Sequence, residues 1–454
     1  MQKRPSYALL LCLEKRKKQR TKIGMLLLRN VHIIAPAQTD LDGQNRDILI
    51  NADGKIDHIA AASSLIANDK TRIFDTPNAH VSIGWFDVGA LTGDPGLEHR
   101  ETLETVSQAA MSGGYTTLAP FPNTEPVVHS KSEILYIKNR TQSYLVDFKP
   151  IGALSTKAEG KDLAEMLDMR AAGAIAFSDG RRTVQDAGLL LRGLQYAKIF
   201  DGLVFNRPND KSTSPHGQMH EGVVSTSLGL PAIPSMAEEM MVQRDLHLVR
   251  YSESRLHFHN LSAARSVALV RQAKEQGLRV TASVAALNLC FTDDILRGFD
   301  TNFKVMPPLR EAADIAALIE GLADGTIDFI TSNHAPIDEE GKNLEFAYAD
   351  FGAIGLETTF GLINKFLHNQ FTINDLVKFL AESPRRVLDI LLPKIAEGET
   401  ANLTIFDPST TWTFTEKHIR SKSKNSPLVG DILRGSVLGV INRGQYNFND
   451  FKFQ

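Results

Sequence analysis

The sequence predicts an α/β protein: a (β/α)8 barrel, or TIM barrel, joined to a small composite β-domain that is built from both ends of the chain. Between about residues 81 and 395, apolar runs alternate with amphipathic helical patterns, which is typical of βα units around a parallel sheet. Residues 25–80 and 396–454 instead carry short β-rich runs broken by turn residues. No glycine-rich phosphate turn opens a βα unit, which favours the barrel over a doubly wound sheet.

Composition is that of a globular protein with one large and one smaller domain. The chain has 454 residues, of which 43% are hydrophobic and 23% charged. Its net charge of -3 gives no reason to expect a nucleic acid or an anionic membrane surface as a partner. Cys12 and Cys290 are the only cysteines, so we expect no disulfide framework and a cytoplasmic location. No apolar run reaches the length of a membrane span.

Residues 1–24 are strongly basic, and Glu14 is their only acid. The short apolar run at 7–13 raises a signal peptide as an alternative, but most of the positive charge follows that run and no small-residue cleavage site is present. We expect a disordered extension or a mis-called start, with Met25 as the beginning of the folded chain.

The two β-rich flanks are expected to pair in one domain. The strands expected in the first flank are 26–34, 47–51 and 55–61. Asp53 and Gly54, between the last two strands, form a hairpin signal. The second flank has the same pattern of short β-rich runs and turn residues, with strands expected at 401–407 and 436–444.

Two βα units illustrate how the barrel is expected to form. Ser262 is placed to cap a helix that Gly277 ends before a strand at 279–282, and the buried face of this helix is Val267, Val270 and Ala273. Gly325 ends a second helix before a strand at 327–331, and the buried stripe of that helix is Ile315, Leu318, Ile319 and Leu322. In such barrels the reactive side chains follow the carboxyl ends of the strands.

Several segments in order resemble the active-site segments of dihydroorotases. The first is 86–102, where the family has Asp-x-His-x-His-x-Arg-x-Pro-Gly, with two metal-binding histidines and an arginine that holds the substrate carboxylate. Further matches follow in the family's order at 113–117, 122–126, 173–179, 228–231, 304–310, 324–328, 334–336 and 355–358. The resemblance covers nearly the whole chain from Met25 and implies an amidohydrolase-type barrel with its composite β-domain.

The residues that should carry the chemistry are replaced. Where the family has its two histidines and the arginine, this chain has Gly89, Leu91 and Gly93. Two further ligand histidines correspond to Asn206 and Asn260, and the aspartate that is both metal ligand and general base corresponds to Asn333. A hydrolytic zinc needs about three protein ligands, and an asparagine amide accepts no proton near neutral pH. The resemblance therefore predicts an inactive member, a pseudoenzyme, that needs no metal cofactor.

Some polar residues on or near the motif positions remain as alternatives. His257 and His259 form a His-x-His pattern on an expected strand, where both share one face; a packed pair is the preferred interpretation over a metal site. Asp179 is an acid at a strand end, and Asn123 aligns with a substrate-contacting asparagine but is also a common turn residue. The other retained residues are His334, for which we expect a supporting or packing role, and the loop pair Arg181 and Arg182, which are placed to meet an anion or to be solvated.

The resemblance implies a place in pyrimidine biosynthesis. Degenerate members of the family resemble structural or regulatory partners of aspartate carbamoyltransferase, which is the function expected here, together with self-association into a homo-oligomer. One alternative is an active dihydroorotase or related cyclic amidohydrolase with an atypical zinc site. Another is a small-molecule binding protein that uses the barrel mouth.

Overall fold

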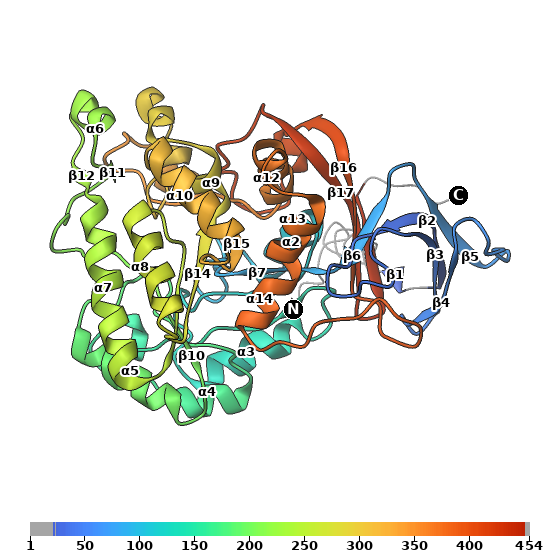
Figure 1. The fold of residues 1–454 in the computed structure, drawn as a ribbon, viewed down its shortest axis with the longest axis horizontal. Helices are drawn as coiled ribbons and strands as arrows, with labels where there is room; N and C mark the ends of the chain where they lie inside the picture. The colour runs from blue at the N-terminus through green and yellow to red at the C-terminus, as the bar shows by residue number, and fades with distance from the viewer. Residues whose placement is uncertain (1–20, 23, 450–454) are drawn as a thin grey trace, which may run out of the picture.

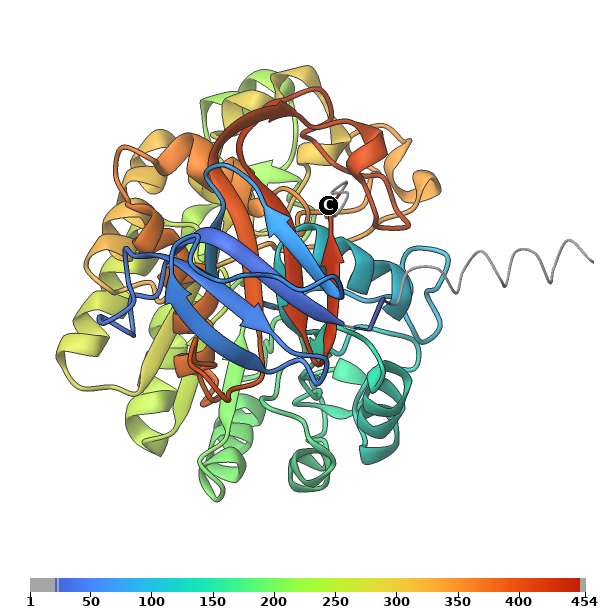
Figure 2. The same ribbon diagram turned by 90° about the vertical axis from the view of Figure 1, so that its right-hand side faces the viewer.

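The computed structural model of the protein describes residues 21–22 and 24–449, and its β-domain is one nine-stranded sheet with the order β1-β18-β17-β16-β6-β2-β3-β4, in which β5 pairs with β2. Both ends of the chain contribute, and they meet where β16 pairs antiparallel with β6. Figure 2 shows these blue and red strands side by side. The strands are β1 (Thr21–Lys22), β2 (Met25–Ile33), β3 (Asn45–Ile50), β4 (Ile56–Ala61), β5 (Thr71–Asp75), β6 (His80–Ile83), β16 (Leu403–Thr413), β17 (Ile432–Asn442) and β18 (Gln445–Phe448).

The sheet extends beyond the limits expected from the sequence. The predicted extension 1–24 lies for the most part outside the described residues, but β1 pairs antiparallel with β18 and so belongs to the sheet. At the other boundary, β6 continues the sheet to Ile83 rather than residue 80. Gly54 turns the chain between β3 and β4 with a φ of 77°, a conformation that favours glycine.

The barrel strands run parallel to one another. They are β7 (Trp85–Val88), β8 (Tyr115–Ala119), β9 (Asp147–Phe148), β10 (Leu203–Asn206), β13 (Arg255–Phe258), β14 (Val280–Ala285) and β15 (Phe329–Thr331). Single parallel bridges from Phe177 to Gly152 and to Val204 join the two groups of strands. The Leu91 amide donates to the backbone carbonyl of His334 at 3.0 Å, which brings the chain after β7 against the chain after β15. The predicted barrel with a composite β-domain is confirmed.

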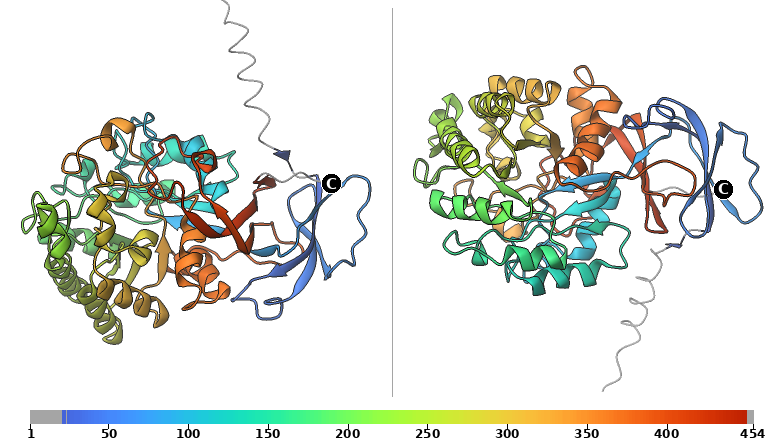
Figure 3. Two further views of the ribbon diagram at one scale, coloured as in Figure 1. Left: turned by 90° about the horizontal axis from the view of Figure 1, so that it is seen from above. Right: turned by 60° about the horizontal axis from the view of Figure 1, so that its bottom comes forward.

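Helices surround the barrel, and the β-domain lies to one side of it (Figures 1 and 3). The long strand β17 leaves the β-domain and packs against helix α12. The helices are α2 (Leu103–Ser112), α3 (Lys131–Thr141), α4 (Met166–Ala172), α5 (Ala187–Lys198), α7 (Ser235–Ser252), α8 (Ala264–Glu275), α9 (Ala286–Cys290), α10 (Ala312–Ala323), α11 (Glu339–Lys342), α12 (Thr359–Leu367), α13 (Ile373–Val377) and α14 (Ser383–Val387). An excursion of β11 (Met219–His220), α6 (Val223–Leu228) and β12 (Ala232–Ile233) precedes α7.

One predicted helix cap is wrong. Helix α8 begins at Ala264, and its N-cap residue Ala263 provides no side-chain hydrogen bond. The Ser262 hydroxyl, the expected cap of this helix, instead donates to Glu238 on α7. The buried carboxylate of Glu238 also accepts the backbone N–H groups of Ser262 and Ala263, so it takes over the role of the cap from a different helix. The amide of Ala264 donates to Asp314.

Within the part of the chain that the structure describes, no helix combines the length and apolar character that crossing a bilayer would require. The interior of the barrel forms its own apolar cluster, separate from the larger core that continues into the β-domain. Its buried members include Phe86, Val88, Phe121, Phe205 and Phe329.

Candidate functional site

The first motif position after β7 has no room for a side chain. Gly89 has a φ of 93°, a backbone conformation that side chains rarely adopt. A Cβ atom at this position would lie 2.6 Å from Cε1 of His259 and 2.9 Å from Cε2 of Phe121. The ring of His259 therefore fills the space in which the family's first metal-binding histidine would begin.

The second and third positions of this motif are closed in different ways. Leu91 packs against the apolar cluster inside the barrel. Gly93 has a φ of 67°, and a Cβ atom there would lie 2.5 Å from the backbone oxygen of Glu101. Because backbone atoms set this limit, the loop as folded does not accept an arginine at position 93.

Three asparagines at the strand ends use their side chains within the protein. The Asn206 amide donates to Asp245 at 2.6 Å, and its oxygen accepts the Val184 N–H at 3.2 Å. The oxygen of Asn260 accepts the Thr331 hydroxyl at 2.8 Å. Burial raises the pKa of Asp245 to about 6, although nearby Arg244 and the Asn206 amide oppose that rise. An uncharged partner at position 206 is thus compatible with the buried Asp245 carboxyl group.

The third asparagine, Asn333, follows β15 and lines the barrel mouth. Its side-chain amide donates to the Met306 carbonyl at 3.2 Å. It also has a φ of 48°, in the left-handed region that asparagine tolerates better than most residues. The position that should supply a general base is therefore a neutral hydrogen-bond donor to the backbone.

The two histidines of the His-x-His pattern lie inside the barrel, with ring centroids 6.2 Å apart. Both nitrogens of His257 face hydroxyl groups, those of Thr281 at 2.8 Å and Ser283 at 3.0 Å, and its ring stacks on Phe329. Burial lowers the pKa of His257 well below its usual range. Burial also lowers the pKa of His259 to about 3, with a further contribution from the positive charge of Arg207. Both rings are therefore neutral at physiological pH.

The retained acid Asp179 and the retained Asn123 hold one loop together. The Asp179 carboxylate accepts the backbone N–H of Ser155 at 2.8 Å and its hydroxyl at 2.5 Å. Burial raises the pKa of Asp179. The Asn123 side chain donates to the Asp179 carbonyl at 3.0 Å and accepts the Arg181 N–H at 2.8 Å. Their polar groups are thus engaged in backbone contacts, and neither side chain lines the cavity at the barrel mouth.

His334, which lines the cavity at the barrel mouth, is paired with the buried acid Glu101. Its Nδ1 accepts the Gly355 N–H at 3.2 Å, and its Nε2 lies 3.4 Å from Oε2 of Glu101. Burial tends to raise the pKa of Glu101, but the nearby His334 ring and hydrogen bonds from Ser421 and Thr105 outweigh it, so that the pKa is lowered. Glu101 also accepts the Lys422 N–H at 3.0 Å. This pair links the barrel to the loop that joins β16 and β17.

The cavity at the barrel mouth is small. Its volume is about 10 Å³, which is roughly the space that one water molecule needs. Its walls include Gly89, Leu91 and Asn333 from the motif positions, together with Arg181 and Arg207. The sequence analysis singled out Arg181 but not Arg207. Arg207 directly follows Asn206 at the end of β10, and this position at a strand end could have identified it as a candidate site residue.

The residues present do not fit a catalytic metal ion. Gly89 and Leu91 offer no donor atom, and the amide nitrogen of Asn206 donates to Asp245. The positively charged guanidinium group of Arg207 lines the same cavity as Gly89 and Leu91. Within residues 21–22 and 24–449, no three His, Cys, Asp or Glu side chains are grouped in a way that could hold a metal ion. These side chains therefore support no step that uses a metal-bound water.

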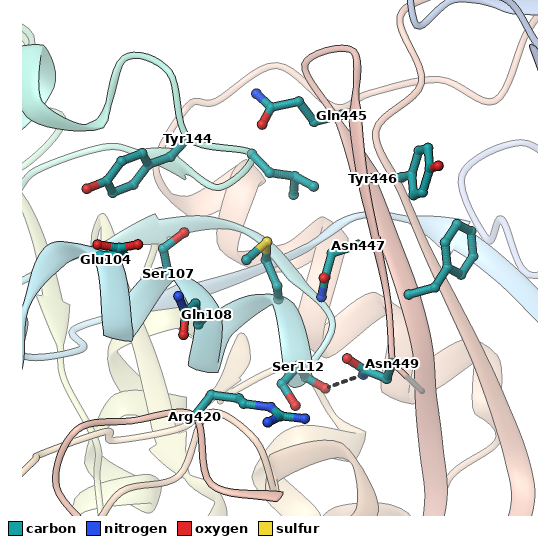
Figure 4. Close-up of a pocket in the computed structure, with 13 residues that line it drawn as sticks. Glu104, Ser107, Gln108, Ser112, Tyr144, Arg420, Gln445, Tyr446, Asn447 and Asn449 are labelled. Atoms are coloured by element: carbon teal, nitrogen blue, oxygen red, sulfur yellow. Dashed lines mark hydrogen bonds between the residues drawn. The ribbon is translucent and has the colours of Figure 1, made fainter. Parts of the chain in front are cut away.

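A second pocket, of about 210 Å³, lies where α2 meets β18 (Figure 4). Its walls include Glu104, Gln108 and Arg420, and the Asn449 side chain donates to the Ser112 carbonyl at 3.1 Å across one end. None of the motif positions at the barrel strand ends lines it. The larger pocket is thus separate from the place where the resemblance puts the chemistry.

Known proteins resemble this chain over nearly its full length. A family model described as Dihydro-orotase-like matches residues 83–266. A protein named dihydroorotase from Pelotomaculum thermopropionicum is 40% identical over 427 residues, covering 94% of this chain and 99% of the relative. Another of that name, from Syntrophus aciditrophicus, is 38% identical over 427 residues with the same coverage of 94% and 99%.

Solved structures support the fold. The L-hydantoinase (dihydropyrimidinase) of Arthrobacter aurescens superposes with a TM-score of 0.81 at 23% identity, covering 95% of this chain and 98% of the other. A dihydropyrimidinase from Brevibacillus agri gives a TM-score of 0.77 at 19% identity, over 94% and 96% of the two chains. The sequence relatives decide the family, and the ordered motifs agree with them: the chain belongs to the dihydroorotase family.

Proposed function

We propose that this chain is a non-catalytic dihydroorotase homologue, a cytoplasmic protein of pyrimidine biosynthesis that acts as a structural or regulatory partner of aspartate carbamoyltransferase. One observation carries the inactivity: the positions that should hold a metal are Gly89, Leu91, Asn206, Asn260 and Asn333. Gly89, Leu91 and Asn333 line a cavity of only about 10 Å³.

Hydrolysis of a cyclic amide needs an activated water and a base that accepts its proton. The metal would lower the pKa of bound water to about 7, and it needs about three protein ligands to do so. Asn333 cannot accept a proton near neutral pH. The mouth also has no space for a ring-sized substrate, since ligand pockets are commonly hundreds of Å³.

The test of inactivity combines turnover with metal content. Purified protein should form and hydrolyse dihydroorotate only at background rates, with or without added zinc, and should hold no stoichiometric transition metal. Asn333→Asp alone should restore nothing, because the ligands and the substrate arginine remain missing. Zinc-stimulated turnover in the wild type that is lost in His334→Ala or Asp179→Asn would instead favour an active enzyme with an atypical site.

An exposed apolar surface supports a protein partner. Met236 and Met240 lie one turn apart on α7 and are 50% and 46% exposed, and Val223 on α6, the preceding helix in the chain, is 76% exposed. Exposed apolar side chains that share one face of a helix are typical of protein interfaces. Methionine is also common at such surfaces because its side chain adapts to different partners.

The partner is tested by size-exclusion chromatography with light scattering, alone and mixed with aspartate carbamoyltransferase from the same organism. We expect a homo-oligomer that co-elutes with the transferase. Met236→Lys combined with Met240→Lys should weaken co-elution, whereas a matched control, Leu391→Lys, should not, because the 89% exposed Leu391 lies far along the chain from α6 and α7. A strict monomer that never co-elutes with the transferase would contradict this proposal.

A further inference from the structure

An arginine at the barrel mouth is almost completely buried. Arg207 follows the last residue of β10, is only 5% exposed and lines the cavity. Among the described residues, its guanidinium group makes no hydrogen bond and no ion pair. Burial lowers the pKa of Arg207 to about 9, and the positive charge of Arg181 lowers it further. A buried guanidinium that lacks a counter-charge is unfavourable, because nothing offsets the loss of its hydration.

The second arginine of the cavity, Arg181, does not supply a compensating acid. Its guanidinium donates to the Phe351 carbonyl. Asp350 lies near enough to favour the charge of Arg181, but that carboxylate already pairs with Arg100 at 3.2 Å. Arg100 also holds Asp338 at 3.0 Å, so the acids at this end of the barrel already have a cation.

Two lysines beside the mouth add to the positive charge. Lys342 and Lys304 donate to backbone carbonyls, which offer no full negative charge. Burial lowers the pKa of Lys342 to about 7, with the charges of Arg181 and Lys304 as further causes. Burial lowers the pKa of Lys304 to about 8, and Asp350 opposes this. The five cations Arg100, Arg181, Arg207, Lys304 and Lys342 therefore outnumber the three acids that act on them, Asp300, Asp338 and Asp350.

The neutral ring of His259 lies beside the same cavity. The Nε2 atom of His259 is buried without a hydrogen-bond partner among the described residues and lies against Gly89, which lines the cavity. The Ser283 hydroxyl lies 3.4 Å from Nδ1 of the same ring. If that hydroxyl donates to Nδ1, the ring proton sits on Nε2 and points at the mouth.

We propose that the barrel mouth binds a small monovalent anion between Arg207 and Arg181, at the place where the resemblance puts the metal. The anion is a halide such as chloride, because a cavity of about 10 Å³ admits one group of about the size of a water molecule. Negative charge beside a guanidinium forms strong charge-assisted hydrogen bonds. The inference does not depend on the carbamoyltransferase partner.

Thermal unfolding at constant ionic strength tests the site. Sodium chloride is exchanged stepwise for sodium gluconate, whose anion is too large for the cavity, and sodium acetate forms a parallel arm that distinguishes a carboxylate from a halide. A ligand that binds only the folded state stabilises it by RT ln(1 + [L]/Kd). The unfolding temperature of the wild type should therefore rise with chloride and not with acetate. Equal temperatures in all three salts, or a rise with acetate that matches the rise with chloride, would overturn the proposal.

Substitutions test whether the dependence of the unfolding temperature on the anion arises at Arg207. Arg207→Met keeps an unbranched apolar stem but removes the charge, so it should abolish the anion dependence and should be more stable than the wild type in gluconate. Arg182→Met is the matched control, because Arg182 is exposed and its guanidinium donates to the Lys157 and Ala158 carbonyls. An Arg207→Met variant with unchanged anion dependence would move the effect elsewhere and reject the site. Line broadening of the ³⁵Cl resonance by the wild type, reversed by bromide, tests the site without any variant.

Discussion

The β-domain and the barrel mouth each bury a charged side chain, and they treat it in opposite ways. Asp47 on β3 is fully buried, but its carboxylate accepts the backbone N–H groups of Asn30 at 2.8 Å, Ser63 at 2.9 Å and Leu65 at 3.0 Å. Arg207 at the mouth is 5% exposed and, among the described residues, has no such partner. The buried carboxylate of Asp47 therefore holds neighbouring backbone segments in place. The buried guanidinium of Arg207 makes the electrostatic potential at the mouth more positive.

The buried charge of Asp47 is compensated within the fold, whereas the buried charge of Arg207 is not and indicates a ligand site. Buried polar groups in folded proteins are almost always hydrogen-bonded, so an exception calls for an explanation. The neighbours of Asp47 in the sheet are apolar and fully buried, for example Ile48 and Ile50. The neighbours of Arg207 include two residues at positions of the family's lost chemistry: Asn206, which precedes it in the chain, and Asn333, which lines the same cavity.

The largest effect is expected from Asp47→Ala. It would leave three backbone N–H groups without their acceptor, and each unsatisfied group costs about 1–3 kcal/mol, so the free energy of unfolding should fall by about 3 kcal/mol or more. Denaturant unfolding measures this change. Asp57→Ala on the neighbouring strand is the matched control, because the Asp57 side chain is 41% exposed. A loss at Asp47 no greater than at Asp57 would remove the contrast with Arg207.

The pH dependence of the barrel should change in Asp87→Asn. Burial raises the pKa of Asp87 to about 6 from its ordinary 3.8, against opposing hydrogen bonds from Ser332. The folded state then binds more protons than the unfolded state, so the stability from this group is full below about pH 4 and is lost as the pH rises through 6. The loss amounts to roughly 2–3 kcal/mol.

Asp87→Asn should therefore gain stability relative to the wild type between about pH 4.5 and 7.5. Unfolding free energies of both proteins across this range measure the gain. Asp57→Asn, in which the exposed carboxylate is replaced, serves as the control and should keep a constant difference from the wild type. A constant difference for Asp87→Asn as well would mean that this buried carboxyl group is not protonated in the folded protein.

Restoring the first family histidine by Gly89→His should destabilise the protein by about 1–3 kcal/mol, the usual range for overpacking. The new Cβ would lie 2.6 Å from the His259 ring, at a φ of 93°. His259→Ala in the same chain should recover part of this loss, and a double-mutant cycle measures the coupling. Gly298→His, where nothing lies within 4 Å of the added Cβ, is the control. Additive effects of Gly89→His and His259→Ala would show that the mouth rearranges freely.

The smallest effect on stability is expected from Met240→Lys. Met240 is 46% exposed, and surface substitutions usually change the free energy of unfolding by less than about 0.5 kcal/mol. Its unfolding curve should match that of the wild type even where association is weakened. A large loss of stability would show that Met240 supports the fold rather than an interface.

Much of the fold follows from local sequence patterns. Short β-rich runs bounded by turn residues predicted β2 and β3. Apolar stripes with helical spacing predicted α8 and α10, because this periodicity reflects which side of a helix faces the core. The ordered motifs predicted the family and located the replaced residues at strand ends. The cap at Ser262 was wrong because Glu238, distant in the sequence, competes for the same N–H groups.

The sequence by itself determined the barrel, the composite β-domain and the identity of the residues that replace the family's ligands. Only the tertiary structure decided that the His259 ring occupies the space beside Gly89, and that Arg207 and Arg181 meet at one small cavity. The physical reason is that burial and charge pairing depend on groups far apart in the chain. The sequence alone does not show whether an arginine that follows a strand contacts solvent, an acidic side chain or a buried cavity that lacks a counter-charge.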